Sequence, residues 1–402
     1  MKRTIILFCV ILCLLAGCGV GPKDEPAGSG STVQTDAPQE VPRVPPEDRN
    51  QAFFCPGFVE TPDGCYYGLF SEMVYGTMIY FCPRGGDAFR PLCGKPNCRH
   101  EDENCNAFCG GAFGYYNGAL YSVDLSEENA LLITQMNLDG SDHRVVGKVD
   151  LTGIPESGFN LTFHHGKLFV MCHAAMNLPL EEQVDHLLLV DLSDFSQKEL
   201  ALDFMADTQF SSPSNFWKDK AYYLSGFGKN ALPGHEETKL CEFDTVTGAV
   251  RVLPVLDNAS TYATDSTLYY LDSCLDGAGN PAEHPGFREY DLQSGEVKDC
   301  GMPVEDAWNA SYDEDYIYVC SVPRESGKYQ TLYILSRDYK LVDQIDLQPG
   351  QLMVAVTSDR IYLTDYEPNG NIFTSSLPIA YYLDKAEIGS RKLTEKPVPV
   401  VE

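Results

Sequence analysis

The residues best suited to chemistry in this chain are cysteines, and they gather near its start. The sequence contains 15 cysteines, of which seven lie between residues 55 and 109. The densest run, residues 93–109, reads CGKPNCRHEDENCNAFC. Thiolates and imidazoles bind borderline metal ions such as zinc, and thiols also form disulfides. The candidate groups in this run are Cys93, Cys98, His100, Cys105 and Cys109.

Three interpretations of this run stay open. Three thiolates and one imidazole, at Cys93, Cys98, His100 and Cys105, could hold zinc tetrahedrally, although the familiar C-x2-C pair is missing. In an oxidising compartment the same cysteines form disulfides, and we place this alternative first. A mixture with free thiols is the third alternative. The expected role is a crosslinked loop that joins two neighbouring structural units, with zinc as the candidate cofactor.

The N-terminus carries an export signal. Two basic residues precede an apolar stretch from Ile5 to Leu15, which is too short to span a bilayer. The following Leu-Ala-Gly-Cys is similar to the lipobox of bacterial lipoproteins, in which the cysteine is lipidated. We therefore expect residues 1–17 to be a signal peptide and Cys18 to be a lipid anchor at the extracytoplasmic face of the cell membrane. A cleaved signal without lipid is the alternative.

Residues 18–50 predict a disordered tether. They contain six prolines and a Gly-Ser-Gly-Ser run, with few apolar residues that could enter a core. The folded domain is expected to cover residues 51–402, with the cysteine-rich run as an insert.

The elements that must position these groups belong to an internal repeat. A turn followed by a short β-rich run, with an aromatic residue at a fixed place, recurs along the chain in steps of 44 to 53 residues. The aligned aromatic residues are Tyr121, Phe169, Tyr222, Tyr269, Tyr318 and Tyr362. We expect these side chains to pack between repeats, because one sheet cannot bury both of its faces.

Most repeats add a second hairpin marked by Asp, Asn and Gly, and a weaker copy runs from Phe58 to Cys93. Four strands in a period of 40–50 residues are typical of a β-propeller. The sequence therefore predicts an all-β protein of about seven four-stranded blades, with six or eight as alternatives. A pair of β-sandwiches would not produce such even spacing.

The lipobox, the propeller repeat and the run from Leu92 to Ala107 together resemble the uncharacterised β-propeller lipoproteins of Gram-positive bacteria. A similar Cys…Cys-x-His…Cys-Asn-Ala stretch recurs near the start of their propellers. The resemblance covers essentially the whole chain after the signal. It implies an extracellular, membrane-anchored propeller and brings no activity with it.

Charge excludes one class of partner. Lysine and arginine total 29 against 58 acidic residues, a net charge of −29, so phosphate backbones repel the protein and we expect no nucleic-acid partner. A closed propeller also leaves no long exposed strand edge, so we expect a monomer.

Short catalytic motifs are missing from the sequence. It has no G-x-S-x-G elbow, no glycine-rich phosphate loop after a strand and no C-x-x-C pair. Whether the protein is an enzyme is left open, and we favour a protein without catalytic activity. Asp124, Asp272 and Asp365 each lie three residues after an aligned aromatic residue. They could form a carboxylate rim that holds a cation or a basic peptide, or they could simply end a strand.

These observations predict a binding or scaffolding module that meets an extracellular peptide, glycan or protein through one propeller face. The alternative is an extracellular polysaccharide-active enzyme, a glycosidase or lyase, whose carboxylates would need a defined separation. A third alternative is an accessory protein of a membrane transporter or sensor.

Overall fold

The computed structural model describes twelve stretches of the chain, and the following account concerns these residues alone. The chain divides into two units, Met1–Arg43 and Val44–Glu402, and every described residue belongs to the second unit. The described stretches are 57–71, 76–126, 129–154, 156–174, 186–200, 215–225, 239–253, 260–272, 284–321, 330–348, 351–364 and 379–400.

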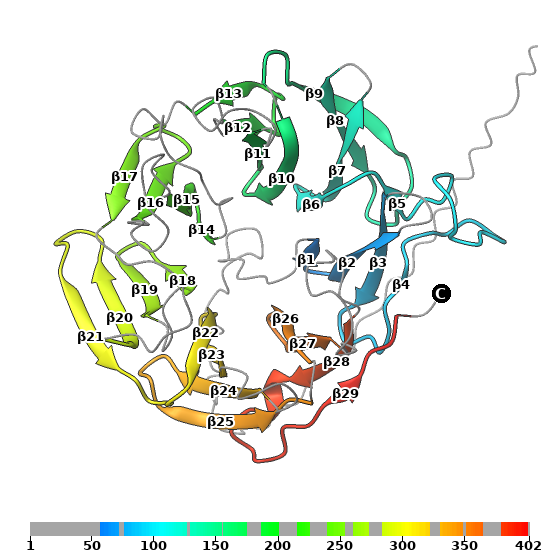
Figure 1. Cartoon of the computed structure of the whole chain (residues 1–402). Helices are drawn as coiled ribbons and strands as arrows, with labels where there is room; N and C mark the ends of the chain where they lie inside the picture. Colours follow the sequence, from blue (N-terminus) through cyan, green and yellow to red (C-terminus); the bar gives the residue numbers. More distant parts are fainter. Residues whose placement is uncertain are drawn as a thin grey trace, which may run out of the picture. The chain divides into compact units, whose positions relative to one another are not determined.

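Seven antiparallel sheets, the blades, are arranged in a ring (Figure 1). Blade 1 contains β1 (Phe58–Thr61), β2 (Gly64–Ser71), β3 (Gly76–Pro83), β4 (Arg90–Pro91) and β5 (Phe108–Cys109). Blade 2 contains β6 (Phe113–Tyr116), β7 (Ala119–Ser126), β8 (Ala130–Met136) and β9 (Arg144–Asp150). Blade 3 contains β10 (Glu156–His164), β11 (Lys167–Ala174), β12 (His186–Asp191) and β13 (Gln197–Glu199).

The remaining four blades repeat this pattern. Blade 4 contains β14 (Asn215–Trp217), β15 (Lys220–Ser225), β16 (Lys239–Asp244) and β17 (Val250–Leu253). Blade 5 contains β18 (Ser260–Ala263), β19 (Thr267–Asp272), β20 (Gly286–Asp291) and β21 (Val297–Gly301). Blade 6 contains β22 (Ala307–Tyr312), β23 (Tyr316–Ser321), β24 (Thr331–Ser336) and β25 (Leu341–Asp346). Blade 7 contains β26 (Met353–Val356), β27 (Arg360–Thr364), β28 (Ile379–Asp384) and β29 (Lys396–Pro397), with the short 3-10 turn η3 (Lys385–Glu387) after β28.

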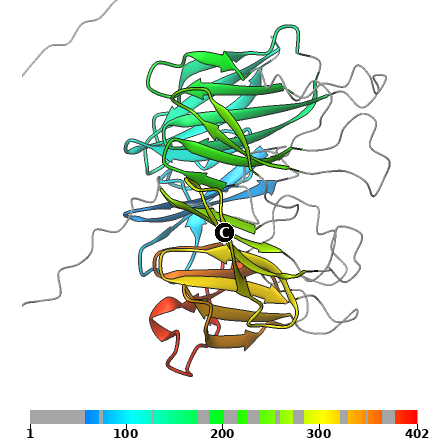
Figure 2. The ribbon, with the colours of Figure 1, turned by 90° about the vertical axis from the view of Figure 1, so that its left-hand side faces the viewer.

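Strand order within each blade follows chain order, from the innermost strand to the outer edge (Figure 1). Seen from the side, the strands run across the thickness of the ring (Figure 2). The predicted β-propeller of seven four-stranded blades is confirmed. The described residues include no apolar helix of membrane-spanning length.

The aligned aromatic residues explain how the blades pack. All six lie on the second strand of their blades, and Phe169, Tyr222, Tyr318 and Tyr362 are almost fully buried. Among the described residues, each pair of neighbouring blades shares one apolar cluster, which gives seven clusters around the ring. Each blade thus buries both faces against its neighbours, as a repeat of single sheets requires.

In the part of the chain that the structure describes, the ring closes between blades 7 and 1 without an exchange of strands, because the four strands of blade 7 are consecutive in the chain. Phe89 forms a parallel bridge with Val400, and its backbone N–H donates to the Pro399 carbonyl at 3.0 Å. Tyr362 of blade 7 packs against Phe58 and Phe89 of blade 1, with ring centroids 5.4 and 5.7 Å apart.

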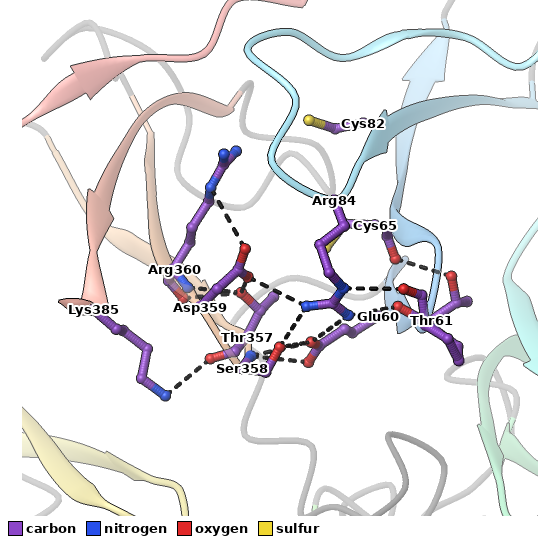
Figure 3. Close-up of polar contacts among 12 residues, drawn as sticks. Glu60, Thr61, Cys65, Cys82, Arg84, Thr357, Ser358, Asp359, Arg360 and Lys385 are labelled. Carbon is purple, nitrogen blue, oxygen red and sulfur yellow. Dashed lines mark hydrogen bonds and ion pairs between the residues drawn. The ribbon is translucent and has the colours of Figure 1, made fainter. Parts of the chain in front are cut away.

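A polar clasp, formed by Glu60, Arg84 and Ser358, supports this closure (Figure 3). The buried Glu60 carboxylate accepts the Ser358 backbone N–H at 3.1 Å and lies 3.3 Å from the Arg84 guanidinium. Arg84 Nη1 also donates to Ser358 Oγ at 2.7 Å. The first and last blades are therefore joined by side chains and by the C-terminal segment.

Candidate metal centre

The cysteine-rich insert interrupts the outer edge of blade 1. β4 pairs with Tyr80 and Phe81 of β3, whereas β5 pairs with Thr77 and Met78 of the same strand. Residues 93–106 leave the sheet between these two short strands, whereas Leu92 and Ala107 still bond to Ile79 of β3. The insert thus follows β4, and its final residues return to the outer edge of the blade as β5.

Four of the five predicted groups converge inside the insert. The ligand atoms of Cys93, Cys98, His100 and Cys105 all lie within 4.8 Å of one another, so the group can hold a metal ion. His100 Nδ1 is 3.2 Å from Cys105 Sγ. Cys105 is buried, and the other three side chains are half-buried.

The local backbone explains how so short a spacing converges. Asn97 and His100 both have left-handed backbone conformations, with φ of 61° and 57°. Such residues reverse the chain within a few positions, and asparagine tolerates this conformation better than most side chains. With this left-handed backbone at His100, the imidazole lies within 4.8 Å of the Cys98 thiol, although only one residue separates the two in the chain.

A backbone amide points at one of the sulfur atoms. The Ala107 N–H donates to Cys105 Sγ at 3.4 Å. Burial alone would raise the pKa of the Cys93 thiol, but the nearby backbone groups of Lys95 and Asn106, together with the thiols of Cys105 and Cys98, hold this pKa below its usual range. Donors aimed at sulfur stabilise the thiolate, which is the form that binds metal.

The Cys105 thiol behaves differently from that of Cys93. Burial, together with the neighbouring thiols of Cys93 and Cys98, raises the pKa of Cys105 to about 12. This thiol keeps its proton near neutral pH unless a cation replaces it. Metal binding at the cluster therefore releases a proton from Cys105.

The insert packs against blade 2. Leu92, Cys105 and Ala107 belong to the same apolar cluster as Phe113 and Leu120 of blade 2. His143 Nε2 lies 3.0 Å from the Asn106 carbonyl and 3.0 Å from the Gly140 carbonyl, so one imidazole bridges the insert and the turn between β8 and β9. The insert thus joins blades 1 and 2.

Cys109 lies outside the four-residue cluster. Its thiol is buried and contacts the Gly111 carbonyl at 3.3 Å, and burial followed by the Asp124 charge raises its pKa to about 12. No disulfide joins any two of the following cysteines, which are free thiols: Cys65, Cys82, Cys93, Cys98, Cys105, Cys109, Cys300 and Cys320.

The predicted rim aspartates are held by different surroundings. Asp124 on β7 accepts the Gly110 backbone N–H at 2.6 Å and the Thr134 hydroxyl at 3.1 Å. Asp272, at the end of β19, lies 3.5 Å from Nε of Arg288, and burial raises its pKa. Asp365 and the predicted lipidation site, Cys18, lie outside the described residues. The structure thus gives Asp124 and Asp272 partners of their own.

Sequence reasoning missed His143, which lies 37 residues from its partner Asn106. The only local signal near it is Gly140, whose left-handed backbone and close approach to the insert exclude a side chain: a Cβ there would lie 2.2 Å from the Leu92 carbonyl oxygen.

No protein-family model matches the sequence, and no curated protein matches it. Among solved structures, the chain is similar to a prolyl endopeptidase (TM-score 0.53, 11% identity, 87% of this chain and 50% of that chain). It is also similar to the β-propeller domain of the Trilobed protease from Pyrococcus furiosus (TM-score 0.47, 12% identity, 85% and 97%) and to BamB from Moraxella catarrhalis (TM-score 0.37, 10% identity, 77% and 81%). At these identities the likeness concerns the fold alone. The chain is a β-propeller protein.

Proposed function

We propose that this protein is an extracytoplasmic binding or scaffolding module, anchored to the cell membrane by a lipid on Cys18. One face of the propeller would meet an extracellular peptide, glycan or protein. The observation that supports this most is the closed ring of seven blades, since such a scaffold holds loops from many blades rigidly on one face. The lipobox-like sequence before Cys18 supports the anchor.

We further propose that Cys93, Cys98, His100 and Cys105 hold a zinc ion. Ligands around tetrahedral zinc with Zn–S distances of about 2.3 Å lie about 3.8 Å apart. Donor atoms that already lie within 4.8 Å of one another need only small movements to reach this arrangement. The protein supplies all four ligands, which is typical of a structural zinc and leaves no open position for a substrate.

In this role zinc would close the insert on itself and hold β4 and β5 at the edge of blade 1. The backbone N–H of Ala107 would stabilise the charge on Cys105, and His143 would fix the end of the insert to blade 2. A zinc ion with three thiolates and one neutral imidazole forms a site with a net charge of −1. The basic residues Lys95 and Arg99 lie in the same loop and offset this charge. The metal would thus contribute folding free energy rather than catalysis.

The zinc proposal is tested by native mass spectrometry and elemental analysis of the full-length protein purified in detergent, with a count of reactive thiols. One zinc per chain, with thiols that react only after chelation, is the expected result. A metal-free protein that is lighter by two hydrogens for each bonded cysteine pair would overturn the zinc assignment and support disulfides.

The anchor and the binding role are tested separately. Replacing Cys18 with alanine should move the protein from the membrane fraction to the soluble fraction, and the wild-type protein should carry the added mass of a lipid at its N-terminus. An unmodified N-terminus would refute the anchor. Arrays of extracellular glycans and peptides should identify a ligand that stays intact after binding, whereas a cleaved polysaccharide would identify an enzyme instead.

A further inference from the structure

We infer that Asp124 of blade 2 is a positioning residue for the metal centre, so that metal binding in the insert and the state of this carboxylate control each other. The inference rests on the proposed zinc site and adds its regulation. The contact behind it was not predicted from the sequence: the Asp124 carboxylate accepts the backbone N–H of Gly110, directly after the insert.

The contact between Asp124 and Gly110 is close and specific. The Gly110 N–H donates to Asp124 Oδ1 at 2.6 Å, while Thr134 Oγ1 donates to Oδ2 at 3.1 Å. A Cβ at residue 110 would lie 2.1 Å from Asp124 Oδ1, so only glycine allows the backbone to come this near. Both carboxylate oxygens are thus engaged, one by blade 2 and one by the insert.

A short, well-paired segment links this contact to the metal ligands. Cys105 and Gly110 are five residues apart in the chain. Between them, the Ala107 N–H donates to Cys105 Sγ, and the Ala107 carbonyl accepts the Ile79 N–H at 2.7 Å. Phe108 and Cys109 then pair with β3 as strand β5. The backbone from Cys105 to Gly110 is therefore held at each step.

Thermodynamic linkage follows from this arrangement. If the carboxylate stabilises the same backbone conformation that metal binding requires, each strengthens the other by the same factor. A hydrogen bond to a charged group is stronger than one to a neutral group, so removing the charge of Asp124 should weaken metal binding by up to about tenfold. Conversely, a basic group of a partner that captures Asp124 from Gly110 would weaken metal binding. A ligand at this carboxylate and the metal at the edge of blade 1 would then compete.

The test compares zinc affinities, measured by competition with a chromophoric chelator, for the full-length wild type and for Asp124→Asn. The amide keeps the size of the side chain but removes the charge that Gly110 meets. We expect binding up to about tenfold weaker in Asp124→Asn and unchanged in the matched control Asp244→Asn, an aspartate that caps a turn in blade 4. Thr134→Val, which leaves the charge in place, should weaken binding by a smaller factor.

A second measurement, hydrogen exchange, follows the backbone that joins the metal ligands to Asp124. Chelation should increase hydrogen exchange of residues 108–112 in the wild type, and in Asp124→Asn these amides should exchange faster even with zinc bound. Wild-type zinc affinity in Asp124→Asn, or unchanged exchange on chelation, would overturn the inference while leaving the zinc site standing. A wild type that binds no zinc would overturn the proposed site and this inference together.

Discussion

The sulfur atom of Cys105 receives the backbone N–H of Ala107, two residues further along the chain. This detail favours a metal over a disulfide, because a thiolate bound to a cation keeps its charge and accepts such bonds, whereas a disulfide sulfur is neutral. With three cysteines in the cluster, one disulfide would also leave one thiol without a covalent partner. At the scale of single residues, this contact supports the proposed zinc site.

Replacing Cys105 with serine should abolish zinc binding and remove the stabilisation that zinc supplies. Zinc at roughly 1,000 times its Kd stabilises a folded protein by about 4 kcal/mol, or roughly 8 °C in Tm for a large domain. Chelation should thus lower the Tm of the wild type by about this amount and leave Cys105→Ser unchanged. Cys300→Ser, at a half-buried thiol in blade 5, is the control and should respond like the wild type. Equal responses in all three proteins would contradict a structural zinc.

A second residue predicts how stability depends on pH. Burial lowers the pKa of His164 from 6.5 to about 3, and its imidazole stacks on Phe216 with ring centroids 4.5 Å apart. As pH falls below 6.5 the unfolded chain gains a proton here, whereas the folded protein gains it only near pH 3. Over that window the imidazole therefore lowers the free energy of unfolding by about 1.4 kcal/mol per pH unit.

Urea unfolding at pH 7 and pH 5 should show a loss of about 2 kcal/mol from this group. The loss should disappear in His164→Gln and persist in His284→Gln, where the histidine is exposed. An identical pH dependence in the wild type and in His164→Gln would show that this imidazole does not titrate as its burial requires.

At the scale of elements, the repeat could be predicted because its signals lie close together in the sequence. An aromatic residue on the second strand and a turn before it recur in most blades, so this spacing and the turn residues of the second hairpins predicted about seven blades, with six or eight as alternatives. The division of the outer edge of blade 1 into β4 and β5 could not be predicted. Each strand has only two residues, too few to show an alternation of apolar and polar side chains. His143 could not be found either, because its contact with the insert joins distant residues.

Two glycines with the same backbone test how tightly the insert is joined to blade 2. Gly118 and Gly140 have φ of 80° and 76°, but an added Cβ meets nothing within 4 Å at Gly118 and the Leu92 carbonyl oxygen at Gly140. Gly118→Ala should cost only the left-handed conformation, about 1 kcal/mol. Gly140→Ala should cost at least about 1–2 kcal/mol more and should also weaken zinc binding. Equal losses of stability, measured by urea unfolding, would show that the contact with the insert is loose.

At the scale of the whole molecule, seven similar interfaces make the ring, and one of them joins residues nearly 300 positions apart: Glu60 and Ser358 are separated by 298. No local pattern could reveal this closure, because the clasp uses an ordinary glutamate and serine. The proposed binding face is supported by the scaffold and by the predicted export signal rather than by a described group of side chains.

Glu60→Gln should loosen the closure between blades 1 and 7. The neutral amide leaves the Arg84 guanidinium without its buried counter-charge, and we expect a loss of about 1–3 kcal/mol in the free energy of unfolding. Hydrogen exchange should rise on both sides of this interface, near Phe89 and Val400, and not between blades 3 and 4. The exposed Glu296→Gln is the control. Wild-type stability in Glu60→Gln would mean that the aromatic packing alone closes the ring.

Because the described strands of each blade are consecutive in the chain, the blades can form one after another. As the chain is synthesised, each new blade can cover the apolar face that the previous blade exposes. One face of blade 1, which carries Phe58 and Phe89, must wait until the last blade and the C-terminal segment have been made. Contacts of such long sequence separation form slowly and leave apolar surface open to aggregation meanwhile. The packing of blade 1 therefore depends on residues 398–400, and a truncation that removes them should expose the apolar face of blade 1.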